Sequence, residues 1–402
     1  MIPTSPRDER DERDQANTIY LDWNATTPPH PDVIAAVREA STVAWANPAS
    51  VHGPGRRARA HVEDARESVA SLLGVHPRDV VLTGGGTEAN NIALLHLFAD
   101  PALSAPSVSG VPGLLVSRIE HPSVIRAAER LAERGVHVTW VDPGADGVIS
   151  PEAIADAFER SRPLATIRLV ALQAVNHETG VVQPIGRVAE MVHARGALLH
   201  VDAVQAAGRL PPDAWAGADL LSIAAHKIRG PKGVGALATR PGIRLRPVIF
   251  GGQQERGLRP GTQDPAACAG FAIAAERARA GPARYAELEP LRDRLELELE
   301  RAGQERGARP LRNGDGPRAP HVSNLSWPGW RGEELCAALD LEGVAVSSGS
   351  ACSAGTAEPS PVLTAMLGKE RASSAVRVSI GEDTSLEDLL EAAQRWSRVL
   401  SR

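Results

Sequence analysis

Cysteine and lysine are both scarce in this chain, which has only three residues of each type among its 402. Cys268, Cys336 and Cys352 show no CxxC spacing, which argues against a disulfide framework and against a thiolate metal site. Long apolar runs are absent too, since none approaches the roughly 18 residues that a membrane helix needs. Residues 1–17 are charged and lack an apolar stretch, so they match neither a signal peptide nor a mitochondrial presequence, and we expect them to be disordered.

An excess of positive charge is also missing. The net charge of −5 gives no reason to expect nucleic acid or an anionic membrane as a partner. The hydrophobic content of 43% and the charged content of 23% are those of a globular protein that is soluble in water. We therefore expect a cytoplasmic protein, and the length allows two domains.

The scarcity of lysine gives the residues that remain a special interest. Only Lys227, Lys232 and Lys369 are lysines among the 44 basic residues, which leaves 41 arginines. Arginine stays charged, whereas the amine of lysine can lose its proton and condense with a carbonyl group. Each lysine is therefore a candidate for amine chemistry, with chance as the alternative. We assign Lys232 and Lys369 to the surface.

Short apolar runs alternate with helical stretches from residue 18 to about 262, which is typical of a parallel sheet with crossover helices. Strands are expected within 80–85, 113–121, 137–142, 167–175, 197–204 and 219–227. A long helical stretch from about 265 to 303 and a Pro/Gly-rich break follow. The sequence thus predicts an α/β large domain over 18–262, whose first residues pack with a smaller α+β domain over 263–402.

Polar residues follow three of the expected strands, where open α/β sheets bind their ligands. The turn GGGTEANN (84–91) opens a helix, so its free N–H groups either hold a phosphate or form a purely structural turn. Asp202 either pairs with a protonated ring nitrogen or caps a helix. Lys227 lies beside His226, ahead of a Gly/Pro turn. An anchor, a pyridinium partner and an amine together indicate pyridoxal phosphate.

The stretch SSGSACSAG (347–355) surrounds Cys352 with small residues. This thiol is either incidental or a nucleophile carried on a mobile loop. Cys268 and Cys336 lie in apolar helical segments, and we interpret them as core residues. We also interpret the lone histidines His96 and His200 as structural.

Taken together, these motifs resemble the cysteine desulfurases of the NifS/IscS-like group, within the class-V family of pyridoxal-phosphate-dependent aminotransferases. The resemblance rests on YLDWNATTP, NPASVHGPGR, GGGTEANN, EHPSV, NHETGVVQ, HVDAVQ, HKIRGPKG, GGQQERGLRPGT and SSGSACSAG. It implies the fold of aspartate aminotransferase (fold type I), with a mixed seven-stranded sheet, a smaller α+β domain and a homodimer whose active sites form at the interface.

The same resemblance implies a reaction. Sulfur would be removed from L-cysteine to give L-alanine and a persulfide on Cys352. An acceptor protein, which the sequence does not identify, would take this sulfur for iron–sulfur cluster or other thio-cofactor biosynthesis. No metal site is expected, although Cys352 could contact a nascent iron–sulfur cluster.

Individual roles follow from the resemblance as well. Lys227 would form the Schiff base with the cofactor, Asp202 would pair with its ring nitrogen, and His121 would stack on the ring and move protons. Further cofactor contacts are implied for Gly86, Thr87, His177, Gln205, His226 and, from the other subunit, Thr262. The substrate would bind to Asn24 and to Arg377, whose guanidinium suits a carboxylate.

Three features depart from the family pattern. Ala224 stands where a serine commonly donates to the phosphate, and His177 stands where an asparagine is usual. The chain also stops at residue 402 without the extended tail that housekeeping members use for a scaffold partner, so we do not assume scaffold docking of that kind.

Other functions remain open at this point. A class-V aminotransferase would not need Cys352, and a selenocysteine lyase would prefer the selenium substrate. A catalytically silent scaffold protein is favoured only by Ala224, and the presence of Lys227, Asp202 and Cys352 argues against it.

Overall fold

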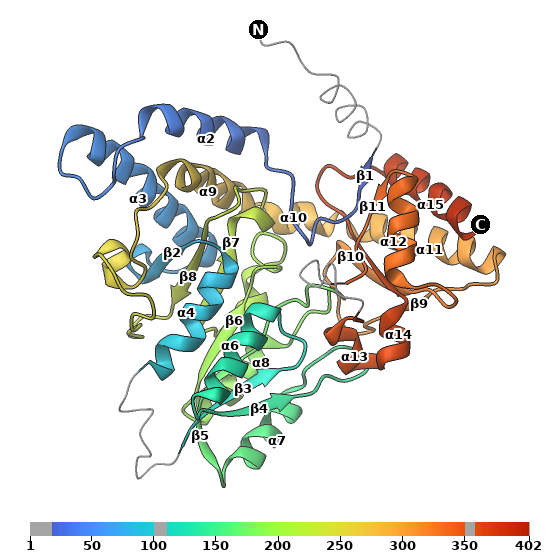
Figure 1. Ribbon diagram of the computed structural model, residues 1–402, viewed down its shortest axis with the longest axis horizontal. Helices are drawn as coiled ribbons and strands as arrows, with labels where there is room; N and C mark the ends of the chain where they lie inside the picture. Colours follow the sequence, from blue (N-terminus) through green and yellow to red (C-terminus); the bar gives the residue numbers. More distant parts are fainter. Residues whose placement is uncertain (1–17, 100–110, 350–357, 402) are drawn as a thin grey trace.

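The computed structural model describes residues 18–99, 111–349 and 358–401 (Figure 1). Its largest sheet has seven strands in the order β2-β8-β7-β6-β5-β3-β4. The strands, in that order, are Val80–Thr83, Gly235–Thr239, Leu220–Ala224, Leu198–Asp202, Ala165–Ala171, Val111–Ser117 and His137–Val141. Only β8 runs antiparallel to its neighbours. The prediction of a mixed, mostly parallel seven-stranded sheet is therefore confirmed.

Helices cover both faces of this sheet, because side chains alternate between the faces along each strand. On one face, Leu114 and Val116 of β3 pack with α4 (Gly86–Phe98) and α6 (Pro122–Glu133). On the other face, Leu115 belongs to a core that includes α3, α7, α8 and α9. These helices span Gly53–Leu73, Pro151–Ser161, Ile185–Ala194 and Pro265–Ala278, and α2 (Pro31–Val43) packs on α9. Both faces are thus buried, as in α/β proteins generally.

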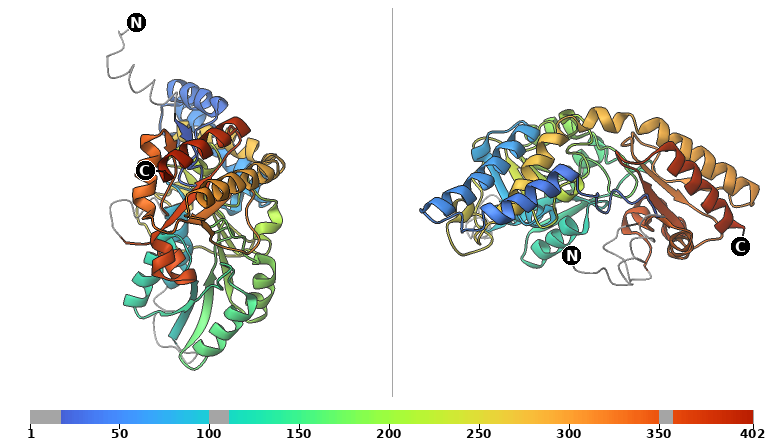
Figure 2. Two further views of the ribbon diagram at one scale, coloured as in Figure 1. Left: turned by 90° about the vertical axis from the view of Figure 1, so that its right-hand side faces the viewer. Right: turned by 90° about the horizontal axis from the view of Figure 1, so that it is seen from above.

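The C-terminal part has a core of its own, around Trp327 and Trp396. It contains a three-stranded antiparallel sheet of β12 (Ala375–Ser379), β10 (Val322–Ser326) and β9 (Leu311–Arg312). Its helices are α11 (Glu289–Glu305), α12 (Gly332–Leu341), α13 (Pro361–Leu367), α14 (Lys369–Ser373) and α15 (Leu386–Leu400). Figure 2 shows α11 and α15 at the end of the molecule opposite α2 and α3.

The first described residues join this C-terminal part. Strand β1 (Ile19–Tyr20) pairs in parallel with β11 (Val344–Ala345), and Asp22 forms a bridge with Ser379 of β12. The chain then crosses to the large sheet. Short 3-10 helices complete the fold at Pro77–Asp79, Pro212–Trp215, Ala225–Lys227 and Gln254–Gly257.

The long helical stretch expected from about 265 to 303 is present and is divided into three helices. Helix α10 (Gly281–Ala286) separates α9 from α11, and Pro282 and Pro290 lie in the first turns of the new helices. Proline suits a first turn but removes a hydrogen bond from a helix interior. Gly281 is required at the first break, because an added Cβ would lie 1.9 Å from the carbonyl oxygen of Gly208.

The predicted domain boundary near residue 262 stays a prediction. Helix α9 shares its core with the large sheet, whereas α11 belongs to the C-terminal core. We therefore propose that the boundary lies after α9. Residues 1–17, which we expected to be disordered, lie outside the described residues. Among the described helices, none is long and apolar enough to cross a membrane.

Candidate active site

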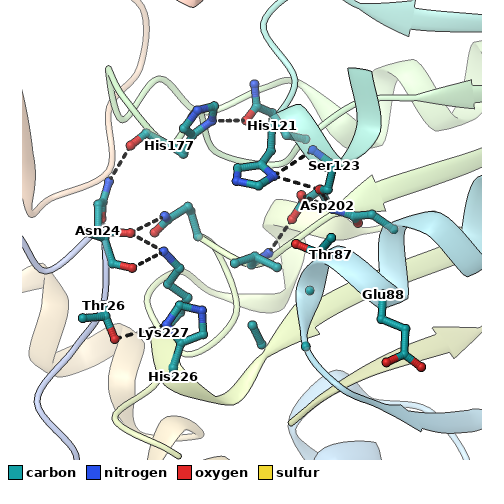
Figure 3. A pocket seen from close by; sticks show the side chains of 18 of the residues that line it. Asn24, Thr26, Thr87, Glu88, His121, Ser123, His177, Asp202, His226 and Lys227 are labelled. Atoms are coloured by element: carbon teal, nitrogen blue, oxygen red, sulfur yellow. Dashed lines mark hydrogen bonds between the residues drawn. The ribbon is translucent and has the colours of Figure 1, made fainter. Parts of the chain in front are cut away.

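A cavity of about 830 Å³ opens at the carboxyl ends of β6 and β7 (Figure 3). Ten of the predicted site residues line it: Asn24, Gly86, Thr87, His121, His177, Asp202, Gln205, His226, Lys227 and Arg377. Thr262 is exposed and is not among the lining residues, so this chain does not bring it to its own cavity. Cys352 lies outside the described residues.

Lys227 is placed by the 3-10 helix that follows β7. Its Nζ donates to the carbonyl oxygens of Ala25, at 2.8 Å, and of Asn24. Burial lowers the pKa of the amine to about 7, and the positive charges of Arg209 and Arg377 add to this effect. A substantial fraction of the amine is therefore uncharged at neutral pH, which is the form that reacts with carbonyl groups.

Asp202 ends β6 with its carboxylate inside the cavity and is 6% exposed. Its two oxygens accept from Asn90 Nδ2 at 2.7 Å and from the main-chain N–H of Val204 at 3.0 Å. The second contact belongs to the turn that follows the strand. No helix begins at this turn, so the alternative of a helix cap is wrong, and the role of charge partner stays a prediction. A carboxylate held by these two donors is positioned to accept a hydrogen bond from a protonated ring nitrogen.

His121 begins α6 as its N-cap residue. Its Nδ1 accepts the main-chain N–H of Ser123 at 3.1 Å, which leaves the proton of the neutral ring on Nε2. Burial lowers the pKa of this imidazole, opposed by the charge of Asp202. The ring of His177 lies 5.4 Å away in an edge-on arrangement. The cap thus fixes a neutral ring at one side of the cavity.

The turn between β2 and α4 presents unpaired donors to the cavity. Gly85 is the N-cap of α4 and has a φ of 143°, and no side chain caps the helix. A Cβ added to Gly86 would lie 2.8 Å from Cγ2 of Val204, so the close approach requires glycine. The free N–H groups of the first turn and the helix dipole suit a phosphate group.

Glu88 does not interfere with an anion at this turn. Its carboxylate accepts the N–H of Gly84 at 2.8 Å and pairs with Arg259 at 2.8 Å. Figure 3 shows this side chain pointing away from Lys227 and His121. Lys232, which we assigned to the surface, is exposed and also lines the cavity.

Arg377 comes from β12, in the C-terminal core, and is 2% exposed. Its guanidinium donates to the carbonyl oxygen of His177 at 3.0 Å and pairs with Asp22 at 2.6 Å. Asn24 donates to the same carbonyl oxygen at 3.1 Å. Arg377 and Asn24, the two residues expected to bind substrate, therefore donate hydrogen bonds to the same carbonyl oxygen, where the two cores adjoin.

His177 presents an unpaired nitrogen to this junction. The side chain is buried, and its Nε2 has no hydrogen-bond partner among the described residues. Burial holds the pKa of the ring well below its usual value, so the ring is neutral. Nε2 lies 3.6 Å from Oε1 of Glu178, which is beyond hydrogen-bond distance.

The segment that carries Cys352 is flanked by two residues beside this junction. Ser347 forms a bridge with Arg377, whose N–H donates to the Ser347 carbonyl oxygen at 2.6 Å. Ser360 donates to Glu178 at 2.5 Å. Both flanks of the segment thus lie close to residues of the site.

Sequence reasoning missed two buried polar residues behind these groups. Asn90 holds Asp202, and Arg209 contacts Asn24, Gln205 and the main chain of Lys227. Asn90 could have been found, because it lies in the turn motif. Nothing in the sequence distinguishes Arg209 from the other arginines of the chain, of which there are 41 in total.

The polar groups that line the cavity agree with the protein family that the sequence matches. The family model of the class-V aminotransferases matches residues 19–391. The chain belongs to the class-V aminotransferase family. Within it, the chain is a member of the NifS/IscS-like group, as the sequence motifs predicted, and it has the fold type I architecture of these pyridoxal-phosphate-dependent proteins.

Several relatives of this class-V member carry a function in their names. The putative cysteine desulfurase IscS 1 of Bacillus subtilis (strain 168) is 35% identical over 96% of this chain and 99% of its own length. A solved NifS-like protein matches with a TM-score of 0.83 at 31% identity, covering 96% of this chain and 99% of that one. A structure described as SspA in complex with cysteine matches with a TM-score of 0.74 at 31% identity, over 90% and 98% of the two chains.

Proposed function

We propose that this protein is a pyridoxal-phosphate-dependent cysteine desulfurase, which converts L-cysteine to L-alanine and leaves a persulfide on Cys352. The observation that carries the proposal is that Lys227, whose pKa burial lowers to about 7, lines one cavity together with Asp202 and the phosphate turn. The relatives named as cysteine desulfurases support the choice of reaction. The structure described with bound cysteine supports the choice of substrate.

The chemistry of the cavity fits the cofactor. The free N–H groups at Gly86 and Thr87, with His226, would hold its phosphate, and Asp202 would pair with its ring nitrogen. On the ring, the remaining contacts are assigned to His121, His177, Gln205 and Lys227. When bound, the cofactor supplies an electron sink that stabilises negative charge at the substrate Cα.

The residues of this chain would have separate roles in the reaction. Arg377 and Asn24 orient the substrate, with the guanidinium binding its carboxylate, and such positioning can contribute several kcal/mol. The uncharged Lys227 amine removes the proton at Cα as a general base, and the ammonium group so formed can return a proton to the substrate, with the Nε2–H of the neutral His121 ring as a further hydrogen-bond donor. The Cys352 thiolate attacks the substrate sulfur. The S–S bond forms as the C–S bond breaks, and protonation of the remaining carbon skeleton gives alanine.

We also propose a cytoplasmic homodimer that hands the sulfur to an acceptor protein. Large apolar side chains lie exposed on two loops, with Trp45 at 74%, Val51 at 86% and Phe250 at 86%. Exposed apolar side chains of this size favour burial against a second chain. Thr262 follows the second of these loops, and a partner subunit would use it to reach the phosphate of this cavity. A reducing compartment would keep the thiol of Cys352 free.

Replacing Lys227 tests the proposal directly. Lys227→Ala should abolish alanine production from cysteine and remove the visible absorbance of the bound cofactor. Lys369→Ala is the matched control, because Lys369 is exposed and lies outside the cavity, and it should keep both. An active Lys227→Ala protein would refute the assignment.

Replacing Cys352 separates the desulfurase from the other class-V reactions. Cys352→Ser should keep the visible absorbance and lose alanine production. If this variant instead transfers the amino group to a keto acid at the wild-type rate, the protein is an aminotransferase. A strong preference for selenocysteine in the wild type would identify a selenocysteine lyase.

A further inference from the structure

Arg209 is a buried arginine directly behind the wall of the cavity, and it is 1% exposed. It follows β6 and the turn that carries Gln205. Its guanidinium donates to Asn24 Oδ1 at 2.9 Å, Gln205 Oε1, the carbonyl oxygen of Lys227 at 2.9 Å and that of Trp23 at 3.3 Å, and lies 3.1 Å from Nε2 of His321. A single side chain therefore contacts three residues of the proposed site.

The partners of this guanidinium are all uncharged. Within the described ranges no salt bridge includes Arg209, and the ring of Tyr285 lies 5.6 Å from its Cζ. Glu382, whose charge also acts on Arg209, pairs with Arg229 and Arg284 instead. Burial lowers the pKa of Arg209, but a guanidinium starts so far above neutrality that it stays charged. A buried charge without a counter-ion costs stability, so its presence favours a functional role.

The contacts of Arg209 lead to the Lys227 amine by two routes. One is the Lys227 main chain, which accepts directly from the guanidinium. The other is Asn24, whose side-chain oxygen accepts from Arg209 while its carbonyl oxygen accepts from Lys227 Nζ. Gln205, which also contacts Arg209, donates to that same carbonyl oxygen at 3.0 Å. The position of the amine thus depends on the guanidinium.

The charges around Lys227 favour the same conclusion. Positive charges or imidazoles face the amine from Arg209, Arg377, His121, His177 and His226, and carboxylates face it from Asp22 and Asp202. After burial, Arg209 has the largest effect in lowering the pKa of Lys227, ahead of Arg377. Arg377 is paired with Asp22, whereas Arg209 has no such compensation.

We propose that Arg209 is a positioning residue for Lys227, which fixes the amine through its hydrogen bonds to Asn24, to Gln205 and to the main chain of Lys227 and places a buried positive charge behind it. The proposal rests on the proposed function, in which Lys227 bonds to the cofactor and removes a proton. Both tasks need an uncharged amine. Arg209 would therefore set the pH at which Lys227 becomes reactive, without touching the substrate or the cofactor.

The small number of lysines allows a direct test. The full-length protein, stripped of cofactor, is treated with trace formaldehyde and cyanoborohydride at a series of pH values. Methylation at Lys227, Lys232 and Lys369 is then quantified by peptide mass spectrometry. The exposed Lys232 and Lys369 serve as internal references in the same sample. In the wild type, Lys227 should reach half of its maximal reactivity near pH 7, well below both references.

Two substitutions separate charge from contact. Arg209→Gln keeps hydrogen-bond donors without the charge and should raise the Lys227 midpoint by about one pH unit or more. Arg209→Lys keeps the charge and should leave the midpoint close to that of the wild type. Arg292→Gln is the matched control: Arg292 is also buried, at 4% exposed, but it donates to the carbonyl oxygen of Ala319 in the C-terminal part and should not move the midpoint.

The proposal is overturned if folded Arg209→Gln keeps the wild-type midpoint, or if Arg209→Lys shifts it as far as Arg209→Gln does. Should Arg209→Gln fail to fold, Arg209→Lys decides: an unchanged midpoint supports the proposal and a raised one overturns it. Failure of the proposed function is a different result, because it appears as visible absorbance or activity that survives Lys227→Ala.

Discussion

At the scale of single residues, the surroundings of Gly86 show how closely the phosphate turn is packed. A Cβ added to Gly86 would lie 3.5 Å from the Cβ of Ala224, which ends β7 and is 2% exposed. The methyl group of Ala224 therefore faces the turn without offering a hydrogen-bond donor. At the proposed phosphate site, Ala224 therefore supplies no side-chain hydrogen bond where the family pattern has a serine.

Restoring that hydroxyl should strengthen cofactor binding. Ala224→Ser is expected to lower the dissociation constant of pyridoxal 5′-phosphate up to about tenfold, because a hydrogen bond to a charged group contributes about 1.5 kcal/mol. The measurement is a titration of the cofactor-free protein, followed by visible absorbance. Pyridoxal, which lacks the phosphate, is the control ligand and should bind both proteins equally. An equal gain for pyridoxal would show that the hydroxyl acts elsewhere.

At the scale of the elements, one buried ion pair ties helix, strand and loop together on the large sheet. Glu255 pairs with Arg66 of α3 at 2.6 and 2.8 Å and accepts the N–H of Leu82 in β2 at 3.0 Å. Glu255 and Arg256 have positive φ values of 48° and 58°. Such conformations cost energy in residues other than glycine, so the ion pair holds the loop in a strained form.

Removing one charge of this pair should destabilise the protein strongly. Glu255→Gln leaves the buried Arg66 guanidinium with only the exposed Glu63, at 3.0 Å, as an ionic partner, and we expect the free energy of unfolding to fall by about 2 kcal/mol. Urea unfolding measures the change. The double variant Arg66→Met with Glu255→Gln should lose less than the sum of the single changes, because the orphaned charge is gone. Strictly additive losses would contradict the coupling.

The elements also show how much of the fold could be predicted from the sequence. The strands and the turn before α4 were predictable, because apolar runs and glycines mark them directly. The helical pattern of 265–303 does not by itself show its two breaks, which the prolines in the first turns of α10 and α11 mark. At the site, motifs located Lys227 and Asp202. They could not locate Arg209, whose role depends on neighbours distant in the sequence.

At the scale of the whole molecule, buried imidazoles make stability depend on acidity. His96 and His200 lie in the large-sheet region, at 2% and 0% exposed, and burial lowers their pKa values to about 4 and about 3. The sequence interpretation of both as structural fits this setting. Glu120 acts in the opposite sense, since burial raises its pKa to about 8 and its stabilising contribution is lost as the pH rises toward that value.

His96 offers the cleanest test of this dependence, because neither of its ring nitrogens has a hydrogen-bond partner among the described residues. Between pH 6.5 and about 4 the unfolded chain binds a proton at His96 that the folded chain does not, so stability falls as the pH falls. At pH 5 this loss amounts to about 2 kcal/mol. His96→Leu should match the wild type at pH 7.5 and exceed it by that amount at pH 5, in urea unfolding at both values. The effect of Glu120 is common to both proteins and cancels in the difference. Parallel stability curves for the two proteins would mean that folding does not lower the pKa of His96.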